Sequence, residues 1–261
     1  MSAGRFGDLG PRVGSAAVMI GLGGGAIWLG GVAMAVLVVA CAGLMTWEAA
    51  RLSGVNQATL VPAGLLGGAA ALNALFLPAP WGWLTLLIPA LMVAAFATRL
   101  RAPIGAHVLA LLAACVLLAL LRESAGLAAV LWLVAVVVAS DVAGYFAGRL
   151  LGGPKFWPAI SPKKTWSGTV AGWVGAALVG AGFALAGLAG WALVALSVPV
   201  AMAGQMGDIA ESWLKRRAGV KDSSALIPGH GGLLDRFDAL ILAALVAGAL
   251  APLGVLPGAG G

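Results

Sequence analysis

Charge is scarce in this sequence: only 9% of its 261 residues are Asp, Glu, Lys or Arg, whereas 62% are hydrophobic. This balance excludes an ordinary soluble domain and a disordered chain, because long apolar runs dominate. Cysteine is scarcer still. Cys41 and Cys115 each lie inside an apolar run, so neither a disulfide framework nor a cysteine metal cluster is expected. We therefore predict a protein whose main solvent is lipid.

The sequence also lacks the nucleotide-binding signatures of common soluble enzymes. It contains no GxxxxGK[ST] loop, and the glycine-rich run from Gly180 lies inside an apolar segment with no strand before it. A P-loop and a dinucleotide-binding fold are therefore excluded. The net charge of +6 comes without a basic stripe interleaved with aromatics, so we predict no nucleic-acid binding. In a membrane protein such an excess is typical of cytoplasmic loops beside anionic lipids.

The apolar segments predict an all-α fold, a polytopic membrane helical bundle of about nine transmembrane helices. No alternating strand pattern is present, and a helix satisfies its own backbone hydrogen bonds within lipid. The segments are close to the roughly 17–25 residues that cross a bilayer. They lie near residues 13–28, 31–47, 58–77, 82–97, 105–121, 126–148, 166–187, 190–207 and 238–256. The 40 glycines favour close helix packing.

The basic residues predict a cytoplasmic N-terminus. If residues 13–47 form a helical hairpin, all of the 15 Lys and Arg residues except Arg122 fall on the cytoplasmic side. If 13–47 is one long helix, Arg5 and Arg12 fall outside as well, so the positive-inside rule favours the hairpin. A cleaved signal peptide over 13–28 is disfavoured, because its glycines weaken the apolar core and more apolar sequence follows at once.

Acidic residues are concentrated in the second half of the chain. Of the nine, only Asp8, Glu48 and Glu123 precede residue 140. We therefore predict a structural, lipid-facing N-terminal region, residues 1–139. The C-terminal region, residues 140–261, is predicted to be a catalytic membrane region with cytoplasmic loops.

Four carboxylates lie inside or at the ends of predicted spans. Asp141 interrupts an apolar run, Asp208 lies where a span meets the cytoplasm, and Asp235 and Asp238 share a helix face. A carboxylate near the bilayer centre costs at least about 2.5 kcal/mol. Clustered carboxylates repel unless a cation lies between them, and Mg²⁺ is commonly held by one or two carboxylates with phosphate and water. We therefore predict a Mg²⁺ site formed by these carboxylates, and a second cation is an open alternative. The other interpretation is that the acids are charges at helix ends near the lipid headgroups.

Basic residues accompany these acids. Lys163 and Lys164, in "SPKKTWSG", precede a helix predicted to begin near Thr165, and a helix N-terminus beside lysines attracts phosphate. A membrane anchor is the alternative for this pair. Lys215 falls on the helix face of Asp208, together with Glu211 and Ser212. His230 lies in "GHGG", where glycines let the backbone approach a ligand closely.

Residues 212–238 read S-x-L-K-R-x4-K-D-x-S-x2-I-P-x-H-G-G-L-x-D-R-F-D. This pattern resembles the signature of the phosphatidate cytidylyltransferase (CDP-diacylglycerol synthase) family. "SDVAGYFAGRLLG" from Ser140 and "SPKKTWSG" resemble two further blocks of that family, so the motifs cover residues 140–238. Ser167 and Ala239 depart from the pattern, since Glu and Ser are common at these positions.

The resemblance implies transfer of the cytidylyl group of CTP to phosphatidic acid, which yields CDP-diacylglycerol and pyrophosphate. It also implies roles for the charged residues. The implied metal ligands for Mg²⁺ are Asp208, Asp235 and Asp238, and the implied catalytic residues are these three with Lys215 and Arg236. The implied nucleotide-binding residues are Lys163, Lys164, Arg216, Lys221, Asp222, His230 and Asp141.

The expected setting is a bacterial plasma membrane that the chain crosses several times, with the active site at the cytoplasmic side. The expected partners are CTP, phosphatidic acid and membrane lipids, and a homodimer stays an open alternative. Two rival functions are a CTP-dependent enzyme acting on another lipid, such as a polyprenol kinase or an ether-lipid cytidylyltransferase, and an ion-coupled transporter. A transporter would favour inverted repeats with broken helices at mid-membrane, whereas these acids gather at one face.

Overall fold

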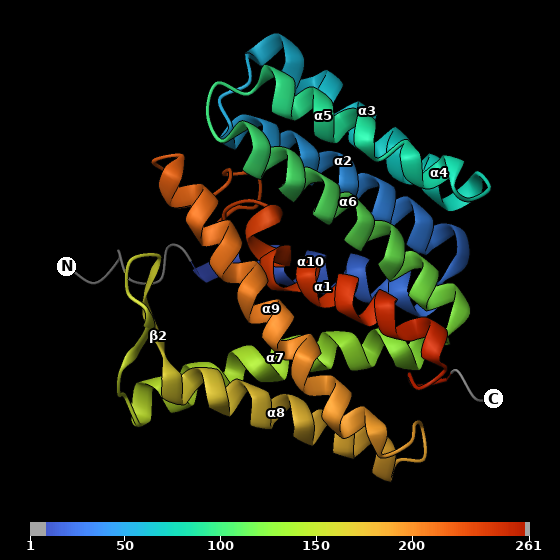
Figure 1. Ribbon diagram of the computed structural model, residues 1–261, viewed down its shortest axis with the longest axis vertical. Helices are drawn as coiled ribbons and strands as arrows, with labels where there is room; N and C mark the ends of the chain where they lie inside the picture. The colour runs from blue at the N-terminus through green and yellow to red at the C-terminus, as the bar shows by residue number, and fades with distance from the viewer. Residues whose placement is uncertain (1–8, 259–261) are drawn as a thin grey trace. The chain divides into compact units, whose positions relative to one another are not determined.

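A computed structural model describes residues 9–258 of the chain. Within that range, eight helices are long and apolar enough to cross a membrane. The protein is therefore a polytopic helical membrane protein, as predicted (Figure 1). The elements in chain order are α1 (Leu9–Leu29), α2 (Gly31–Leu52), α3 (Gln57–Phe76), α4 (Trp81–Leu84), α5 (Leu87–Phe96), α6 (Arg101–Ser124), α7 (Gly126–Leu150), β1 (Lys155–Trp157), β2 (Ser161–Thr165), α8 (Trp166–Leu185), α9 (Ala192–Arg217), α10 (Leu234–Leu250) and a final 3-10 turn, Ala251–Leu253.

The chain forms two compact units that do not follow the order of the sequence. Among the described residues, the first contains residues 9–112 together with Arg217–Phe237, and the second contains Ala113–Arg216 with residues 238–258. The predicted division into a structural region, residues 1–139, and a catalytic region, residues 140–261, concerns activity and stays a prediction.

In the first unit, α2 and α3 approach closely at glycines. A Cβ atom on Gly43 would lie 3.0 Å from the carbonyl oxygen of Gly64, and one on Gly67 would overlap the side chain of Thr46. These glycines thus serve close helix packing, as predicted.

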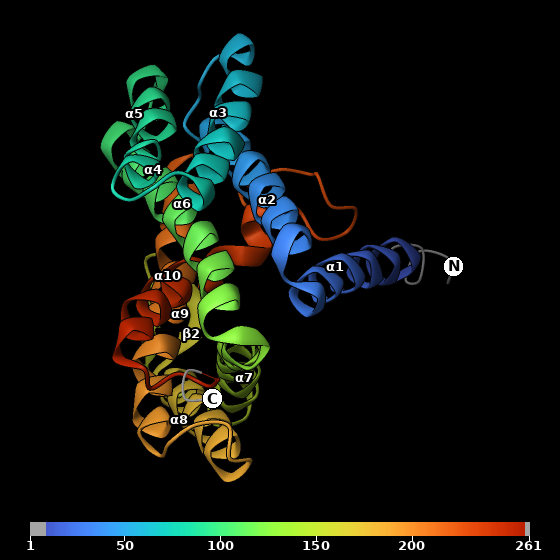
Figure 2. The ribbon, with the colours of Figure 1, turned by 90° about the vertical axis from the view of Figure 1, so that its right-hand side faces the viewer.

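The first long apolar region is broken at a glycine. Gly30 separates α1 from α2 with φ 64° and ψ −158°, a conformation that no helix contains. The region predicted as 13–47 therefore forms two helices rather than one, and Figure 2 shows α1 turning away from α2.

The predicted span near 82–97 differs from the others. It forms two short helices, α4 and α5, within the apolar stretch Trp81–Phe96. Pro89 explains the break, because its ring and missing N–H disfavour a helical bond to the carbonyl of Thr85, four residues earlier. The total number of spans and the cytoplasmic N-terminus remain predictions.

In the second unit, α7 and α8 lie side by side (Figure 1). A Cβ on Gly144 would lie 3.1 Å from the carbonyl oxygen of Gly168, so glycine again permits the approach. The buried ring of Trp132 on α7 donates a hydrogen bond of 3.0 Å to Oγ of Ser197 on α9. This bond ties a third helix into the unit.

Between α7 and α8 the chain forms a small antiparallel hairpin, β1 and β2, with Lys155 opposite Thr165. No strand was expected here, because strands of three and five residues are too short to show an alternating pattern. The helix that follows begins at Trp166, close to the predicted start. The hydroxyl of Thr165 caps it by accepting from the amide of Gly168 at 3.2 Å.

Candidate active-site residues

Three carboxylates gather in the second unit. Asp141 on α7, Asp208 on α9 and Asp238 on α10 lie within electrostatic range of one another. A glycine accounts for part of this, because a Cβ on Gly207 would lie 2.5 Å from the carbonyl oxygen of Asp238. The backbone of α10 therefore passes close to α9 one residue before Asp208.

Lys164 joins this acidic group from strand β2. Its Nζ lies 2.5 Å from Oδ2 of Asp208 and 3.4 Å from the carbonyl oxygen of Gln205. Lys163 is exposed, and successive residues of a strand point to opposite faces, so the two predicted phosphate-binding lysines are separated. Lys164 also interacts electrostatically with Asp141.

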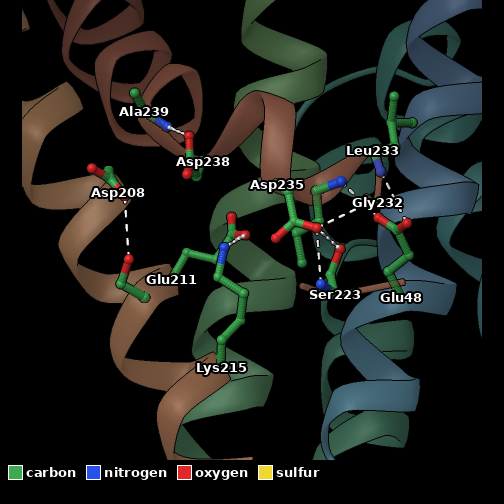
Figure 3. Close-up of polar contacts among 12 residues, drawn as sticks. Glu48, Asp208, Glu211, Lys215, Ser223, Gly232, Leu233, Asp235, Asp238 and Ala239 are labelled. Carbon is green, nitrogen blue, oxygen red and sulfur yellow. Dashed lines mark hydrogen bonds and ion pairs between the residues drawn. The ribbon is translucent and has the colours of Figure 1, made fainter. Parts of the chain in front are cut away.

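The predicted polar face of α9 is present. The hydroxyl of Ser212 donates to Oδ1 of Asp208 at 3.3 Å. The Nζ atom of Lys215 lies 3.0 Å from Oε1 of Glu211 (Figure 3). The Glu211 side chain is fully buried and that of Lys215 is 10% exposed, so this pair is shielded from water. Lys215 also lies within electrostatic range of Asp238, which places a cation beside the acids. Arg216, the next predicted site residue, is exposed.

In the first unit, Asp235 fastens the signature loop, which we define as residues 221–234. Its Oδ2 accepts hydrogen bonds from the amide of Ser223 at 2.8 Å, the hydroxyl of Ser223 at 2.9 Å and the amide of Gly232 at 2.8 Å (Figure 3). Asp235 is 7% exposed. One carboxylate oxygen therefore joins two parts of the loop that are far apart along it.

Glu48 on α2 binds the same loop, although its position in the sequence predicted no role in the site. Its Oε1 accepts from the hydroxyl of Ser224 at 2.5 Å and the amide of Leu233 at 2.9 Å, and its Oε2 accepts from the amide of Leu234 at 2.6 Å. Glu48 is fully buried. An acid inside an apolar helix is a signal that could have found it, but its partners lie far along the chain.

His230 is tied to α1. Its Nδ1 lies 2.9 Å from Oγ of Ser15, which also donates to the carbonyl oxygen of Pro228 at 3.0 Å. The loop turns tightly here, since Gly229 and Gly231 have φ of 75° and 82°. His230 could either order its loop or contact pyrophosphate, and the hydrogen bonds of Ser15 support the first role. Contact with pyrophosphate stays a prediction.

The remaining predicted site residues lie at the surface of the first unit. Lys221, Asp222 and Arg236 are exposed and accessible to a ligand. The prediction that Asp208 and Asp235 hold the same metal involves both units and also stays a prediction.

The two departures from the family pattern have local contacts. The hydroxyl of Ser167 donates to the carbonyl oxygen of Gly152 and lies 3.0 Å from the hydroxyl of Thr165, so it supports the start of α8. The amide of Ala239 donates to Oδ1 of Asp238 at 2.7 Å, a backbone contact that needs no particular side chain at residue 239.

The carboxylates of the acidic group suit a Mg²⁺ ion that is bound mainly through substrate phosphates and water. Among the described residues, no three His, Cys, Asp or Glu side chains are grouped closely enough to hold a metal. Mg²⁺ does not need such a cage, because it is usually held by one or two carboxylates together with substrate phosphates and water. Asp208 and Asp238 offer hard oxygen ligands of that type.

The structure is that of a polytopic membrane protein in which carboxylates of α7, α9 and α10 gather with Lys164 of the hairpin and Lys215 of α9. The sequence profile of the Cytidylyltransferase family matches residues 11–253. The chain therefore belongs to the Cytidylyltransferase family, in agreement with the resemblance of its motifs.

Curated relatives named phosphatidate cytidylyltransferase match part of the chain. The Brucella suis protein is 49% identical over 133 residues, which are 49% of this chain and 48% of the relative. The Helicobacter pylori J99 protein is 47% identical over 122 residues, 46% of each chain. The Staphylococcus saprophyticus protein is 43% identical over 122 residues, 46% of this chain and 47% of the relative. The chain spans about half the length of the curated relatives it matches.

Proposed function

We propose that this protein transfers the cytidylyl group of CTP to the phosphate of phosphatidic acid, which produces CDP-diacylglycerol and pyrophosphate. The proposed setting is the cytoplasmic side of a bacterial plasma membrane. The observation that carries the proposal is the gathering of Asp141, Asp208 and Asp238 with Lys164 and Lys215 in one unit of a membrane protein. Family membership and the names of the relatives support it.

In the proposed reaction, a phosphate oxygen of the lipid forms a bond to the α-phosphorus of CTP. The bond from that phosphorus to the oxygen bridging the α- and β-phosphates breaks, and pyrophosphate leaves with its electron pair. The nucleophile is already anionic, so no strong general base is needed. The protein must align two anions and neutralise their charge.

The basic residues suit that task. Lys164 is partly accessible, so a phosphate oxygen can reach it in place of Asp208. Lys215 lies near Asp238 and balances charge from within the helix bundle. The exposed Lys163, Arg216, Lys221 and Arg236 add positive charge for the triphosphate and the lipid phosphate, while Asp222 and His230 are proposed nucleotide contacts.

Asp208 and Asp235 are the leading proposed Mg²⁺ ligands, and Asp238 is the third candidate. When bound, Mg²⁺ would polarise phosphoryl oxygens and offset the charge of the triphosphate. The carboxylates of this chain would fix its position, and Asp141 would lie near the nucleotide rather than on the metal.

Acceptor assays test the proposal. Purified protein in detergent would be given labelled CTP and Mg²⁺ with phosphatidic acid, with a polyprenol or with no acceptor. Label is expected in CDP-diacylglycerol only when phosphatidic acid is present. Label transferred only to the polyprenol, or to neither lipid, would contradict the proposal.

A further inference from the structure

The carboxylate of Glu48 caps a helix to which it does not belong. The first N–H groups of a helix lack partners within the helix and carry partial positive charge. At the start of α10, the amides of Leu233 and Leu234 donate to the two oxygens of Glu48 at 2.9 and 2.6 Å. A charged side chain of α2 thus fixes the point where the signature loop ends and α10 begins.

The same carboxylate holds the other end of the loop. The hydroxyl of Ser224 donates to Oε1 of Glu48 at 2.5 Å and accepts from the amide of Leu226 at 3.0 Å. Glu48 therefore joins residue 224 to residue 233, and the tight turn that carries His230 lies between these two points. The hydroxyl of Ser224 and the amides of Leu233 and Leu234 all donate to the carboxylate oxygens of Glu48.

Glu48 and Asp235 act on adjacent residues. Ser223 and Gly232 bind Asp235, whereas Ser224 and Leu233, the next residue in each case, bind Glu48. Each end of the loop is therefore hydrogen-bonded to both buried carboxylates. Figure 3 shows Glu48 and Asp235 directed toward this part of the loop.

Gly232 makes this double attachment possible. A Cβ atom there would overlap the hydroxyl of Ser223 and lie 2.5 Å from Oε1 of Glu48. Its φ is not in the left-handed region, so the requirement for glycine comes from close approach and not from backbone conformation.

We propose that Glu48 is a positioning residue for nucleotide binding: it holds the signature loop in the conformation that presents Asp222 and His230 to CTP. It acts through the loop and does not touch substrate. This inference rests on the proposed function, because the loop is taken to bind CTP.

The test uses two changes at Glu48 and one matched control. Glu48→Gln keeps the length but places an amide N–H₂ against an N–H or O–H donor, and Glu48→Asp keeps the charge but is one methylene too short. Thr46→Val is the control, because Thr46 is also fully buried on α2 and its hydroxyl bonds only to its own helix, at Ala42. Two readouts are measured in the full-length protein: kcat/KM for CTP, and hydrogen exchange of the amides of residues 232–234.

Hydrogen bonds to a carboxylate stabilise the loop more than bonds between neutral groups do. We therefore expect kcat/KM for CTP to fall by about 10-fold or more in both Glu48 variants. Exchange at residues 232–234 should rise by a similar factor, while Thr46→Val stays near wild type in both readouts. Ser224→Ala, which removes one bond, should change both in the same direction by a smaller factor. It also keeps the test decisive where a Glu48 variant fails to fold.

Three results would overturn the proposal. They are wild-type exchange in Glu48→Gln, faster exchange with unchanged CTP kinetics, and losses in Thr46→Val equal to those at Glu48. A wild-type protein with no CTP turnover would instead contradict the proposed function. The exchange comparison would still decide whether Glu48 holds the loop.

Discussion

The Nζ atom of Lys164 lies 2.5 Å from Oδ2 of Asp208, so a strand residue and a residue of a membrane helix form an ion pair. Their side chains are 25% and 31% exposed, which leaves the pair accessible to a phosphate. The hairpin of β1 and β2 brings the lysine to this position. A flexible loop would not hold it there, since ordering a long side chain costs conformational entropy.

Replacement of Lys164 by alanine should mainly raise the apparent KM for CTP, by about 10-fold or more, because one charge-assisted contact to phosphate is lost. Steady-state kinetics over a range of CTP concentrations would measure this. Lys155→Ala is the matched control, since it removes an exposed lysine from β1 of the same hairpin. A large loss of activity that saturating CTP fails to restore would contradict this role.

Asp235→Asn should abolish turnover while expression and membrane insertion stay near normal. The structure adds a second expectation, because an amide cannot reproduce three hydrogen bonds to one carboxylate oxygen. The signature loop should loosen, and trypsin should cleave faster after Lys221, which is exposed. Wild-type activity in this variant would remove Asp235 from the active site.

The face of α9 was predictable because a helix repeats every 3.6 residues, so Asp208 and Ser212, and Glu211 and Lys215, had to be neighbours. The membrane helices were predictable because a long apolar run within lipid must satisfy its own backbone hydrogen bonds, which a helix does. The family motifs pointed to the acids of α7, α9 and α10, three of which do gather in one unit.

The remaining features do not appear in the hydrophobic periodicity of the sequence. The partners of Glu48 lie 176 or more residues further along the chain, and nothing in "MTWEAARL" indicates which amides it meets. The strands of the hairpin are too short to show alternation, and the break between α4 and α5 depends on one proline in an otherwise apolar run. The partners of Glu48 are set by tertiary packing, whereas the short strands and the proline break are local features that hydrophobic periodicity does not detect.

Gly232→Ala should destabilise the protein by roughly 1–3 kcal/mol, because the added methyl group overlaps Ser223 and Glu48. Activity should fall with stability, since the loop must move away from α2. Thermal unfolding in detergent and CTP turnover would measure both effects. Gly190→Ala is the control, because a Cβ there meets nothing within 4 Å. Equal thermal midpoints for the two variants would show that Gly232 has more room than the structure indicates.

Removal of divalent cations should abolish turnover but leave the fold intact. The described residues contain no group of three or more potential ligands that would form an all-protein cage, so Mg²⁺ is expected to bind largely through the phosphates of CTP. A chelator should therefore stop CDP-diacylglycerol formation and change the thermal midpoint little, and added Mg²⁺ should restore activity. Asp208→Asn should raise the Mg²⁺ concentration needed for half-maximal activity, because one carboxylate ligand is lost. Full turnover in excess chelator would show that the acids of α7, α9 and α10 serve charge balance with Lys164 and Lys215 and not metal binding.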